Sequence, residues 1–451
     1  MSTAESHLAP VPHTGGAVLP SFGEAFKVWF KIGCLSFGGP AGQIAMMHRI
    51  LVDEKKWIDE ARYLHALNYC MLLPGPEAQQ LATYVGWLMH GVRGGLAAGL
   101  LFVLPGALFM LGLSFIYVLA SGIPVVDGAL FGIKAAVLVI VVEAIIRISR
   151  RGLKTSLLLG IAAAAFIGIF FLQLPFPLIV VAAGIAGYLA ARVAPARLGI
   201  KDGEAARAPP RPDRWRAMGK AGAIWLAVWW APVVLAVFIL GPHHVLVSLG
   251  VFFSKLAVVS FGGAYALMAY MAQEVVEAQG WLRLSEMVDG LGLAETTPGP
   301  LILVTQFVGY LAAYREAAPF SPLIAGTIGA AMTTWVVFAP SFLWIFAGAP
   351  FIEDLRNNKR LAGALATITA AVVGVILNLA VWFTLHVLFS KIAETHTGPI
   401  RWFAIEWASL DIRAAVLTAI AATLAFVLHR GLIETVAIMA ALGIVARFAL
   451  G

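Results

Sequence analysis

Charged residues are scarce in this chain. Asp, Glu, Lys and Arg make up 12% of the 451 residues, whereas a typical soluble domain has roughly 25%. Hydrophobic residues make up 61%, and the mean hydropathy is +0.89. This composition leaves no room for a soluble domain of any size. The sequence therefore predicts an all-α polytopic membrane protein, with the lipid bilayer among its partners.

Motifs for cofactor and nucleotide chemistry are also missing. Cys34 and Cys70 are the only cysteines, and neither has metal-ligand spacing. No GxxxxGK[ST] phosphate loop, HExxH or paired CxxC occurs in the sequence. We therefore expect no cofactor, no metal, no disulfide, no catalytic residue and no ATP hydrolysis. Residues 1–20 lack a basic region followed by an apolar core, which predicts a polar cytoplasmic tail rather than a cleaved signal peptide.

Two glycine- and proline-rich breaks reveal an internal duplication. Residues 36–40 read Ser-Phe-Gly-Gly-Pro, and residues 74–76 read Pro-Gly-Pro. Ser-Phe-Gly-Gly recurs at 260–263 and Pro-Gly-Pro at 298–300, both displaced by 224 positions. An ungapped correspondence of this length predicts two related repeats.

Such breaks have a definite meaning in a membrane. Proline removes a backbone donor and glycine adopts conformations that other residues avoid. At membrane depth, unpaired backbone groups are tolerated only where protein buries them or a cavity receives them. The alternative is that the prolines merely kink packed helices. Because the breaks occur at matching places in two halves, we favour a transporter's binding site.

About 13 transmembrane segments are predicted. They cover residues 22–52, 62–90, 95–120, 126–147, 155–173, 175–194, 219–241, 245–276, 284–312, 322–346, 361–389, 411–428 and 431–449. The domains are then a tail at 1–20, a first repeat at 21–194, a basic linker at 195–218, an extra helix at 219–241 and a second repeat at 245–451. The extra helix turns the second repeat upside down, giving two inverted-topology repeats with discontinuous helices. Whether each broken segment crosses or returns as a re-entrant hairpin stays open.

Basic residues indicate the orientation. They gather at residues 147–154 and in the linker, which predicts a cytoplasmic N-terminus and a periplasmic C-terminus. The loop from His48 to Arg62, which this topology places outside, dissents because it holds Arg49, Lys55 and Lys56. The net charge of +7 is read as a topology signal, so no nucleic-acid partner is expected.

Lys31 and Lys255 occupy matching positions, each five residues before its Ser-Phe-Gly-Gly break. A cation within a span is costly and by default faces a cavity or pathway. The alternative, snorkelling to the interface, suits Lys27 better. Ammonium groups, hydroxyls and the backbone N–H groups of restarting helices together suit a small anion. For the hydroxyls, local helix capping is an equal alternative. The predicted substrate-binding residues are Lys31, Ser36, Gly38, Gly39, Pro74, Gly75, Pro76, Glu77, Gln80, Lys255, Ser260, Gly262, Gly263, Thr297, Pro298, Gly299 and Pro300.

Glu77 and Glu295 are candidates for proton coupling, because a carboxylate facing the cavity would repel an anion unless protonated. Glu77 at a helix start could equally act as a cap, whereas Glu295 near a helix end is disfavoured by the helix dipole. Lys134 and Glu143 are interpreted as polar groups on a packing face. Trp402 and Trp407 predict an interfacial helix. The run from Gly94 to Gly99 predicts close helix packing.

The chain resembles the chromate ion transporter family in its long, two-domain form. The resemblance rests on SFGGP at 36–40, LLPGPEAQQLATYVGW at 72–87, GGLAAGLLFVLPG at 94–106, SFGG at 260–263 and TTPGPL at 296–301. It implies efflux of chromate across the inner membrane, giving chromate resistance, with sulfate as a look-alike. The second copy has Ala264 where the first has a proline, and Leu301 in place of Glu77, so we expect the halves to differ in their roles.

Together these features predict a secondary active transporter that exports chromate by alternating access. A dianion leaving a negative cytoplasm gains about 4–5 kcal/mol per 100 mV, so membrane potential, proton exchange or both could drive it. The alternatives are a transporter of another small inorganic anion such as sulfate, an anion channel, or an intramembrane enzyme. The sequence leaves the oligomeric state open, a homodimer included.

Overall fold

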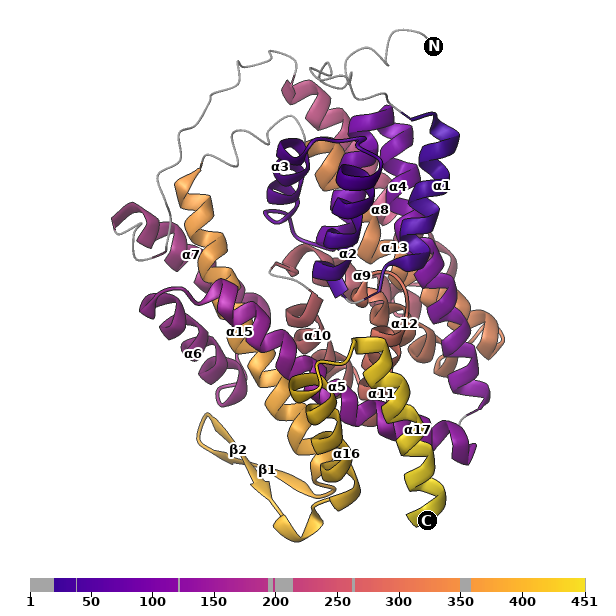
Figure 1. The fold of residues 1–451 in the computed structure, drawn as a ribbon, viewed down its shortest axis with the longest axis vertical. Helices are drawn as coiled ribbons and strands as arrows, with labels where there is room; N and C mark the ends of the chain where they lie inside the picture. The colour runs from indigo at the N-terminus through magenta and orange to yellow at the C-terminus, as the bar shows by residue number, and fades with distance from the viewer. Residues whose placement is uncertain are drawn as a thin grey trace. The chain divides into compact units, whose positions relative to one another are not determined.

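The computed structural model describes residues 20–37, 39–120, 122–193, 198, 214–261, 264–348 and 358–450. Helices dominate this part of the chain, which confirms the prediction of an all-α polytopic membrane protein (Figure 1). The chain forms two compact units. Unit 1 comprises Met1–Ser114, Glu204–Ala264 and Thr297–Asn357, and unit 2 comprises Phe115–Gly203, Tyr265–Thr296 and Asn358–Gly451. Each unit therefore takes segments from both predicted repeats.

Unit 1 contains α1 (Phe22–Leu35), α2 (Gly39–His48), the π-helical η2 (Arg49–Glu54), α3 (Glu60–Cys70), most of α4 (Glu77–Leu119), α8 (Arg214–Leu240), α9 (Val245–Val259), the short η5 (Leu301–Leu303), α12 (Val304–Arg315) and α13 (Pro322–Gly348). Unit 2 contains α5 (Pro124–Gly152), α6 (Ser156–Phe170), α7 (Phe176–Val193), α10 (Ala264–Gln273), η4 (Glu274–Ala278), α11 (Leu284–Thr296), α15 (Lys359–Leu388), β1 (Ile392–Thr397), β2 (Ile400–Ile405), η7 (Trp407–Ser409), α16 (Ile412–Ala422), η8 (Thr423–Val427) and α17 (Leu432–Leu450). Seven of the described helices are long and apolar enough to cross a membrane, and four shorter ones are apolar.

The long helix α4 doubles back on itself. His90 and Gly91 leave the helical conformation, Gly91 with φ 59° and ψ −152°. A Cβ on Gly94 would overlap the carbonyl oxygen of Gly86, although residues eight apart in a straight helix are about 12 Å apart along its axis. Residues 77–89 and 92–119 are therefore two antiparallel arms. This confirms the predicted boundary near residue 90 and the close packing at Gly94 to Gly99.

Residues 22–54 enter and leave on one face of unit 1. After η2, Lys55 Nζ lies 3.1 Å from Glu24 Oε1 in the first turn of α1. At the end of the first arm of α4, His90 Nε2 donates to the Pro20 carbonyl oxygen at 2.9 Å. Residues 22–54 and 60–89 are thus two re-entrant hairpins, and their breaks lie at the tips.

This geometry decides between the two alternatives for the first repeat. The count of about 13 crossings stays a prediction; seven of the described helices are long and apolar enough to cross a membrane, and four shorter ones are apolar. Lys55 lies on the same face as the start of α1, so the loop from His48 to Arg62 is on the side of the N-terminus, which the predicted orientation makes cytoplasmic. Its basic residues then follow the same positive-inside pattern as the other basic loops.

The second repeat shows part of the same arrangement. His244, which corresponds to Pro20 at the displacement of 224, donates from Nε2 to the Ala318 carbonyl oxygen at 2.8 Å. The start of α9 therefore lies beside the segment that follows α12. From there α13 packs on α12, and a Cβ on Gly329 would overlap the carbonyl oxygen of Gly309.

In unit 2, β1 and β2 form an antiparallel hairpin between α15 and α16. The predicted interfacial helix is wrong, because Trp402 lies in β2 and Trp407 in the 3-10 turn η7. Residues 400–405, Ile-Arg-Trp-Phe-Ala-Ile, are rich in β-branched and aromatic side chains, which favour a strand. Arg401 anchors the hairpin to the connection between α6 and α7, where its backbone N–H donates to Phe171 O at 2.7 Å.

Candidate functional site

The four breaks meet in unit 1 as two crossed pairs. Gly75 donates its backbone N–H to the Ser260 carbonyl oxygen at 3.1 Å, and Gly299 donates to the Ser36 carbonyl oxygen at 2.7 Å. Positions 75 and 299 are related by the displacement of 224, and so are positions 36 and 260. Each Pro-Gly-Pro break is therefore bonded to the Ser-Phe-Gly-Gly break of the other repeat. Discontinuous segments that meet at a repeat interface are typical of transporter binding sites.

Two buried glutamine side chains support the crossed breaks. Gln80 Nε2 donates to the Pro74 carbonyl oxygen at 2.7 Å, and Gln43 Nε2 donates to the Gly299 carbonyl oxygen at 2.7 Å. Gln80 was among the predicted residues, but Gln43 was missed. A polar side chain in the otherwise apolar segment of α2 was the only sequence signal for it.

Several buried hydrogen-bond acceptors around the breaks have no donor among the described residues. Within the described part of the chain, the side-chain amide oxygens of Gln43, Gln79, Gln80 and Gln306 are buried without a hydrogen-bond partner. Buried polar atoms in native proteins are normally satisfied by protein or ordered water. The interior around the breaks therefore holds hydrogen-bond acceptors that the described protein contacts do not satisfy.

The glycines of the breaks are required by backbone geometry. Gly75 has φ +117° and Gly299 has φ +92°, a region that residues with a side chain rarely adopt. A Cβ on Gly299 would stand 3.3 Å from Gly106 Cα, and a Cβ on Gly106 would overlap the Pro298 carbonyl oxygen. The second Pro-Gly-Pro break thus packs backbone to backbone on the second arm of α4.

The predicted hydroxyl donors bond within their own helices. Ser36 Oγ donates to Ile32 O at 2.6 Å, and Ser260 Oγ donates to Ala257 O at 3.1 Å. For these two side chains, the geometry is the local capping that was the alternative to ligand binding. Lys31 on α1 and Lys255 on α9 have exposed side chains.

The remaining predicted residues occupy varied positions. Gly39 begins α2, Pro76 directly precedes α4, and Pro74, Thr297, Pro298 and Pro300 are buried. Gly38, Gly262 and Gly263 lie outside the described residues. Ligand binding by the whole predicted set stays a prediction.

Both predicted carboxylates lie at helix ends, as expected. Glu77 is the first residue of α4 and is half-buried. Glu295 lies in the last turn of α11 in unit 2 and is buried, with an exposed fraction of 7%. Their role in proton coupling stays a prediction.

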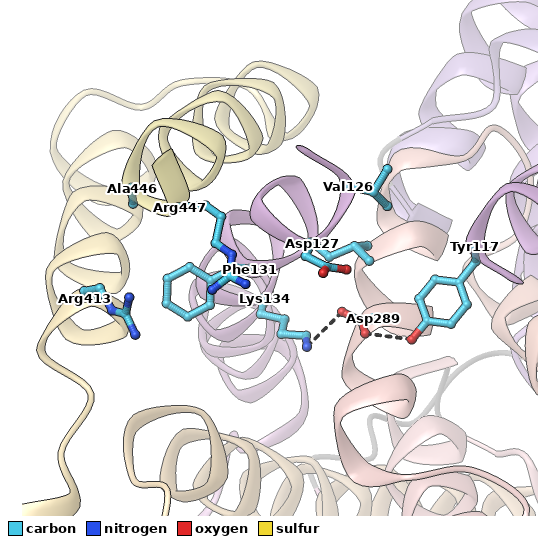
Figure 2. A pocket seen from close by; sticks show the side chains of 10 residues that line it. Tyr117, Val126, Asp127, Phe131, Lys134, Asp289, Arg413, Ala446 and Arg447 are labelled. Atoms are coloured by element: carbon cyan, nitrogen blue, oxygen red, sulfur yellow. Dashed lines mark hydrogen bonds and ion pairs between the residues drawn. The ribbon is translucent and has the colours of Figure 1, made fainter. Parts of the chain in front are cut away.

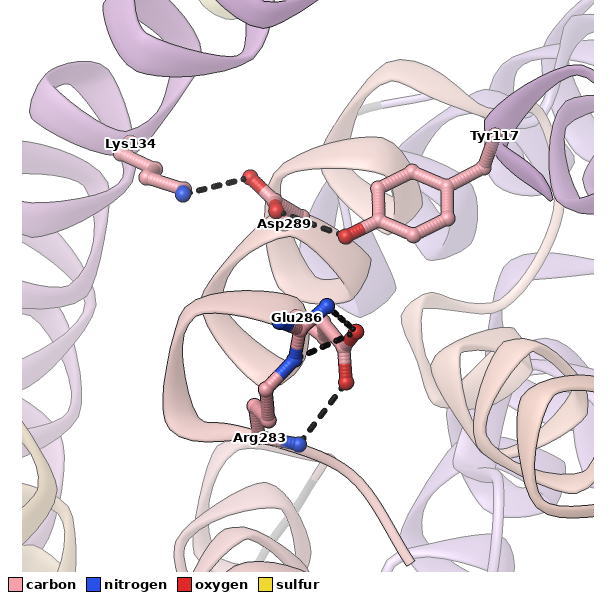
Figure 3. A network of polar contacts seen from close by, with 5 residues as sticks. All are labelled: Tyr117, Lys134, Arg283, Glu286 and Asp289. Atoms are coloured by element: carbon pink, nitrogen blue, oxygen red, sulfur yellow. Dashed lines mark hydrogen bonds and ion pairs between the residues drawn. The ribbon is translucent and has the colours of Figure 1, made fainter. Parts of the chain in front are cut away.

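Unit 2 holds a cavity with several charged lining residues, which sequence reasoning missed (Figure 2). Its volume is about 300 Å³, and its charged lining residues are Asp127, Lys134, Asp289, Arg413 and Arg447. The Lys134 ammonium lies 3.1 Å from Asp289 Oδ1, and Tyr117 donates its hydroxyl to Asp289 Oδ2 at 2.9 Å (Figure 3). Asp289 itself is 4% exposed.

Lys134 lies on a packing face of α5, as predicted, where it pairs with a buried carboxylate of α11. Glu143 instead forms an exposed ion pair with Arg147 on the same helix. Lys134 is a charged residue within the apolar helix α5, and such residues are functional candidates by default. The ion pair joins α5 to α11, which lie more than 150 positions apart in the sequence. Residue spacing alone does not predict such a contact.

The neighbouring pair of Arg283 and Glu286 has a structural role. Glu286 accepts the backbone N–H of Arg283 at 2.8 Å and its guanidinium Nη2 at 2.7 Å (Figure 3). A carboxylate that accepts N–H groups in the first turn of α11 stabilises the start of that helix.

Comparisons with known proteins agree on one family. A family model described as "Chromate transporter" matches residues 23–188 and 247–446, and the two matches begin 224 positions apart. A chromate transport protein of Pseudomonas aeruginosa is 34% identical over 364 residues, covering 79% of each chain. An uncharacterized transporter of Methanocaldococcus jannaschii is 29% identical over 82% of this chain and 86% of its own. A chromate transport protein of Cupriavidus metallidurans is 28% identical over 77% and 79%. No solved structure matches.

Proposed function

The chain belongs to the chromate transporter family, and from this premise we propose that it is a secondary active transporter that exports chromate across the inner membrane. The relatives of Pseudomonas aeruginosa and Cupriavidus metallidurans are named chromate transport proteins, and we extend that substrate to this chain. The observation that carries the mechanism is the pair of crossed hydrogen bonds from Gly75 to Ser260 and from Gly299 to Ser36.

The crossed breaks support alternating access by two inverted repeats. Each break interrupts a helix at a tip and belongs to one repeat, while its hydrogen-bond partner belongs to the other. A shift of one repeat against the other would therefore open the site to one side and close it to the other. In this proposal Lys31 and Lys255 attract the dianion towards the breaks, and backbone N–H groups of the restarting helices bind it.

The membrane potential favours the outward direction. With the basic loops and the N-terminus in the cytoplasm, export moves two negative charges out of a negative compartment, which releases about 4–5 kcal/mol per 100 mV. An exchange in which protons enter the cytoplasm down their gradient as chromate leaves would add to this driving force, and Glu77 and Glu295 are the proposed proton-binding residues.

Counterflow in proteoliposomes tests the substrate. Vesicles loaded with unlabelled chromate should take up labelled chromate from outside, and excess outside sulfate should compete if the two dianions share the site. Uptake of labelled sulfate without any chromate exchange would favour the second candidate, a sulfate transporter. Rates that do not saturate with chromate concentration would favour a channel.

A further inference from the structure

The cavity of unit 2 lies beside the N-terminal part of α5. Its volume of about 300 Å³ is roughly ten times the ~30 Å³ that one water molecule occupies in the liquid. This space suits a small inorganic ion that keeps part of its hydration shell. It is at the lower limit for organic ligands, whose pockets are typically about 300–1,000 Å³.

Glycine contacts hold the walls of this cavity in place. A Cβ on Gly132 of α5 would overlap the Met439 carbonyl oxygen of α17, and a Cβ on Gly443 of α17 would overlap the Gly128 carbonyl oxygen of α5. Gly128 and Gly132 form a GxxxG pattern, which allows helix backbones in membranes to approach closely. The same contact brings Arg447 of α17 beside Gly128, so its position does not depend on a flexible loop.

The charges of the cavity are not balanced within it. Lys134, Arg413 and Arg447 face the cavity together with the carboxylates Asp127 and Asp289 (Figure 2). Asp289 is already engaged by the Lys134 ammonium and the Tyr117 hydroxyl. Among the lining residues three cations then face two carboxylates, which leaves the lining with one surplus positive charge; Asp411, outside the lining, lies 3.8 Å from Arg413 Nε.

Arg413 occupies a position that is unfavourable for a cation. It lies in the first turn of α16, where the helix dipole favours negative charge. Its Nε is 3.8 Å from Asp411 Oδ1, beyond hydrogen-bond distance. That oxygen already accepts the backbone N–H groups of Arg413 and Ala414 at 2.9 and 3.1 Å. Arg413 therefore forms an ion pair with Asp411 at a distance too long for a hydrogen bond, which leaves its N–H donors able to bind a ligand in the cavity.

We propose that this cavity binds a small divalent oxyanion of the sulfate and chromate class, held by Arg413 and Arg447, with Lys134 shared between Asp289 and the bound ion. Guanidinium groups match the oxygens of such ions by paired N–H donors. Asp127 repels the ion and so opposes tight retention, which suits a site that must release its ligand.

The place of this site on the transport route rests on the proposed function. Arg147 and Arg150, which mark the cytoplasmic side by the positive-inside rule, lie at the opposite end of α5. The cavity is then on the periplasmic side, and it serves as the last binding site before the exported anion leaves.

Equilibrium binding of radiolabelled sulfate to the purified full-length protein in nanodiscs tests the proposal. Arg413→Gln and Arg447→Gln should each weaken sulfate binding at least about tenfold, a loss of about 1.4 kcal/mol. Asp289→Asn, which releases Lys134 from its carboxylate, should tighten it. Arg430→Gln is the matched control, because Arg430 forms an exposed ion pair with Glu434 in the first turn of α17, at the other end of that helix from Arg447. Unchanged elution volume and melting temperature would show that the variants fold.

The outcomes separate this proposal from the proposed function. Sulfate binding that is unaltered in the Arg413→Gln, Arg447→Gln double variant, or that is undetectable in the unmodified protein, overturns the anion cavity. If the unmodified protein exchanges chromate while the double variant binds sulfate normally, the proposed function stands and the cavity proposal falls. If the two arginine variants lose sulfate binding but the unmodified protein moves no chromate, the cavity stands and the proposed substrate falls.

Discussion

Gly75 donates its backbone N–H to the carbonyl oxygen of Ser260 across the interface between the two repeats, at 3.1 Å. The corresponding residues, Gly299 and Ser36, make the same contact at 2.7 Å. In both copies of the duplicated sequence, the backbone groups at a break are therefore hydrogen-bonded to a break of the other copy. The proposed transport mechanism rests on this reciprocal pairing, because a shift of one repeat against the other would change both contacts.

Replacing either glycine of the crossed pairs should lower stability and transport more than replacing a glycine of positive φ elsewhere. Gly75→Ala and Gly299→Ala each force an L-residue into positive φ, which costs about 1–2 kcal/mol, and each brings a Cβ within 3.3 Å of neighbouring atoms. We expect a lower melting temperature and slower chromate uptake. Gly398→Ala is the control, since Gly398 has φ +62° but open space around it. Equal effects at all three positions would argue against a special role of the breaks.

Removing the Gln43 side chain should destabilise the second break. Gln43→Leu leaves the buried Gly299 carbonyl oxygen without its side-chain donor, at a cost of about 1–3 kcal/mol in the free energy of unfolding. Gln279→Leu is the comparison, because Gln279 is exposed and its side chain donates to the exposed Glu274 carboxylate at 3.1 Å. Thermal unfolding in detergent measures both. A Gln43→Leu protein as stable as the Gln279→Leu protein would contradict the assignment.

The matching lysines should be needed for transport rather than for stability. Lys31→Ala and Lys255→Ala should each raise the chromate concentration at half-maximal uptake by tenfold or more, since about 1.4 kcal/mol of attraction is lost. Lys27→Ala is the matched control, because Lys27 lies one turn before Lys31 on α1 and is also exposed. If all three variants transport alike, Lys31 and Lys255 are interfacial lysines.

Much of the fold follows from the sequence because the strongest signals are local. Apolar length predicts most helices, and glycine with proline predicts the breaks and the turn near residue 90. The return of residues 22–54 as a hairpin is seen in the contact between Lys55 and Glu24, and apolar length in the sequence cannot distinguish a hairpin from a crossing. The dissenting basic loop was the available hint.

The candidate site was predicted only in part, for the same reason. The duplicated motifs identify Gly75, Gly299, Ser36 and Ser260, but not that each pairs across the repeats. Lys134 and Asp289 lie on different helices, and no motif connects them. Pairings of this kind depend on helix packing at positions such as Gly132 and Gly292, which a single sequence does not specify.

The re-entrant hairpins predict the sidedness of two loops. In a background carrying Cys34→Ser and Cys70→Ala, single cysteines at Lys56 and Arg150 should react with an impermeant maleimide from the same face. A cysteine at Lys391, beside the β-hairpin, should react from the opposite face. The Lys56 position reacting together with Lys391 would restore a true crossing over residues 22–52 and remove the hairpin from the account.

Chromate uptake by inside-out membrane vesicles tests the central claim, export driven by an ion gradient, most directly. The membrane potential and the pH gradient are imposed separately, and vesicles that carry the Gly75→Ala, Gly299→Ala double variant serve as the background. An interior-positive potential should drive chromate accumulation above the outside concentration, and an interior-acid pH gradient should increase it if protons are exchanged. Chromate that merely equilibrates, with no response to either gradient, would contradict active export.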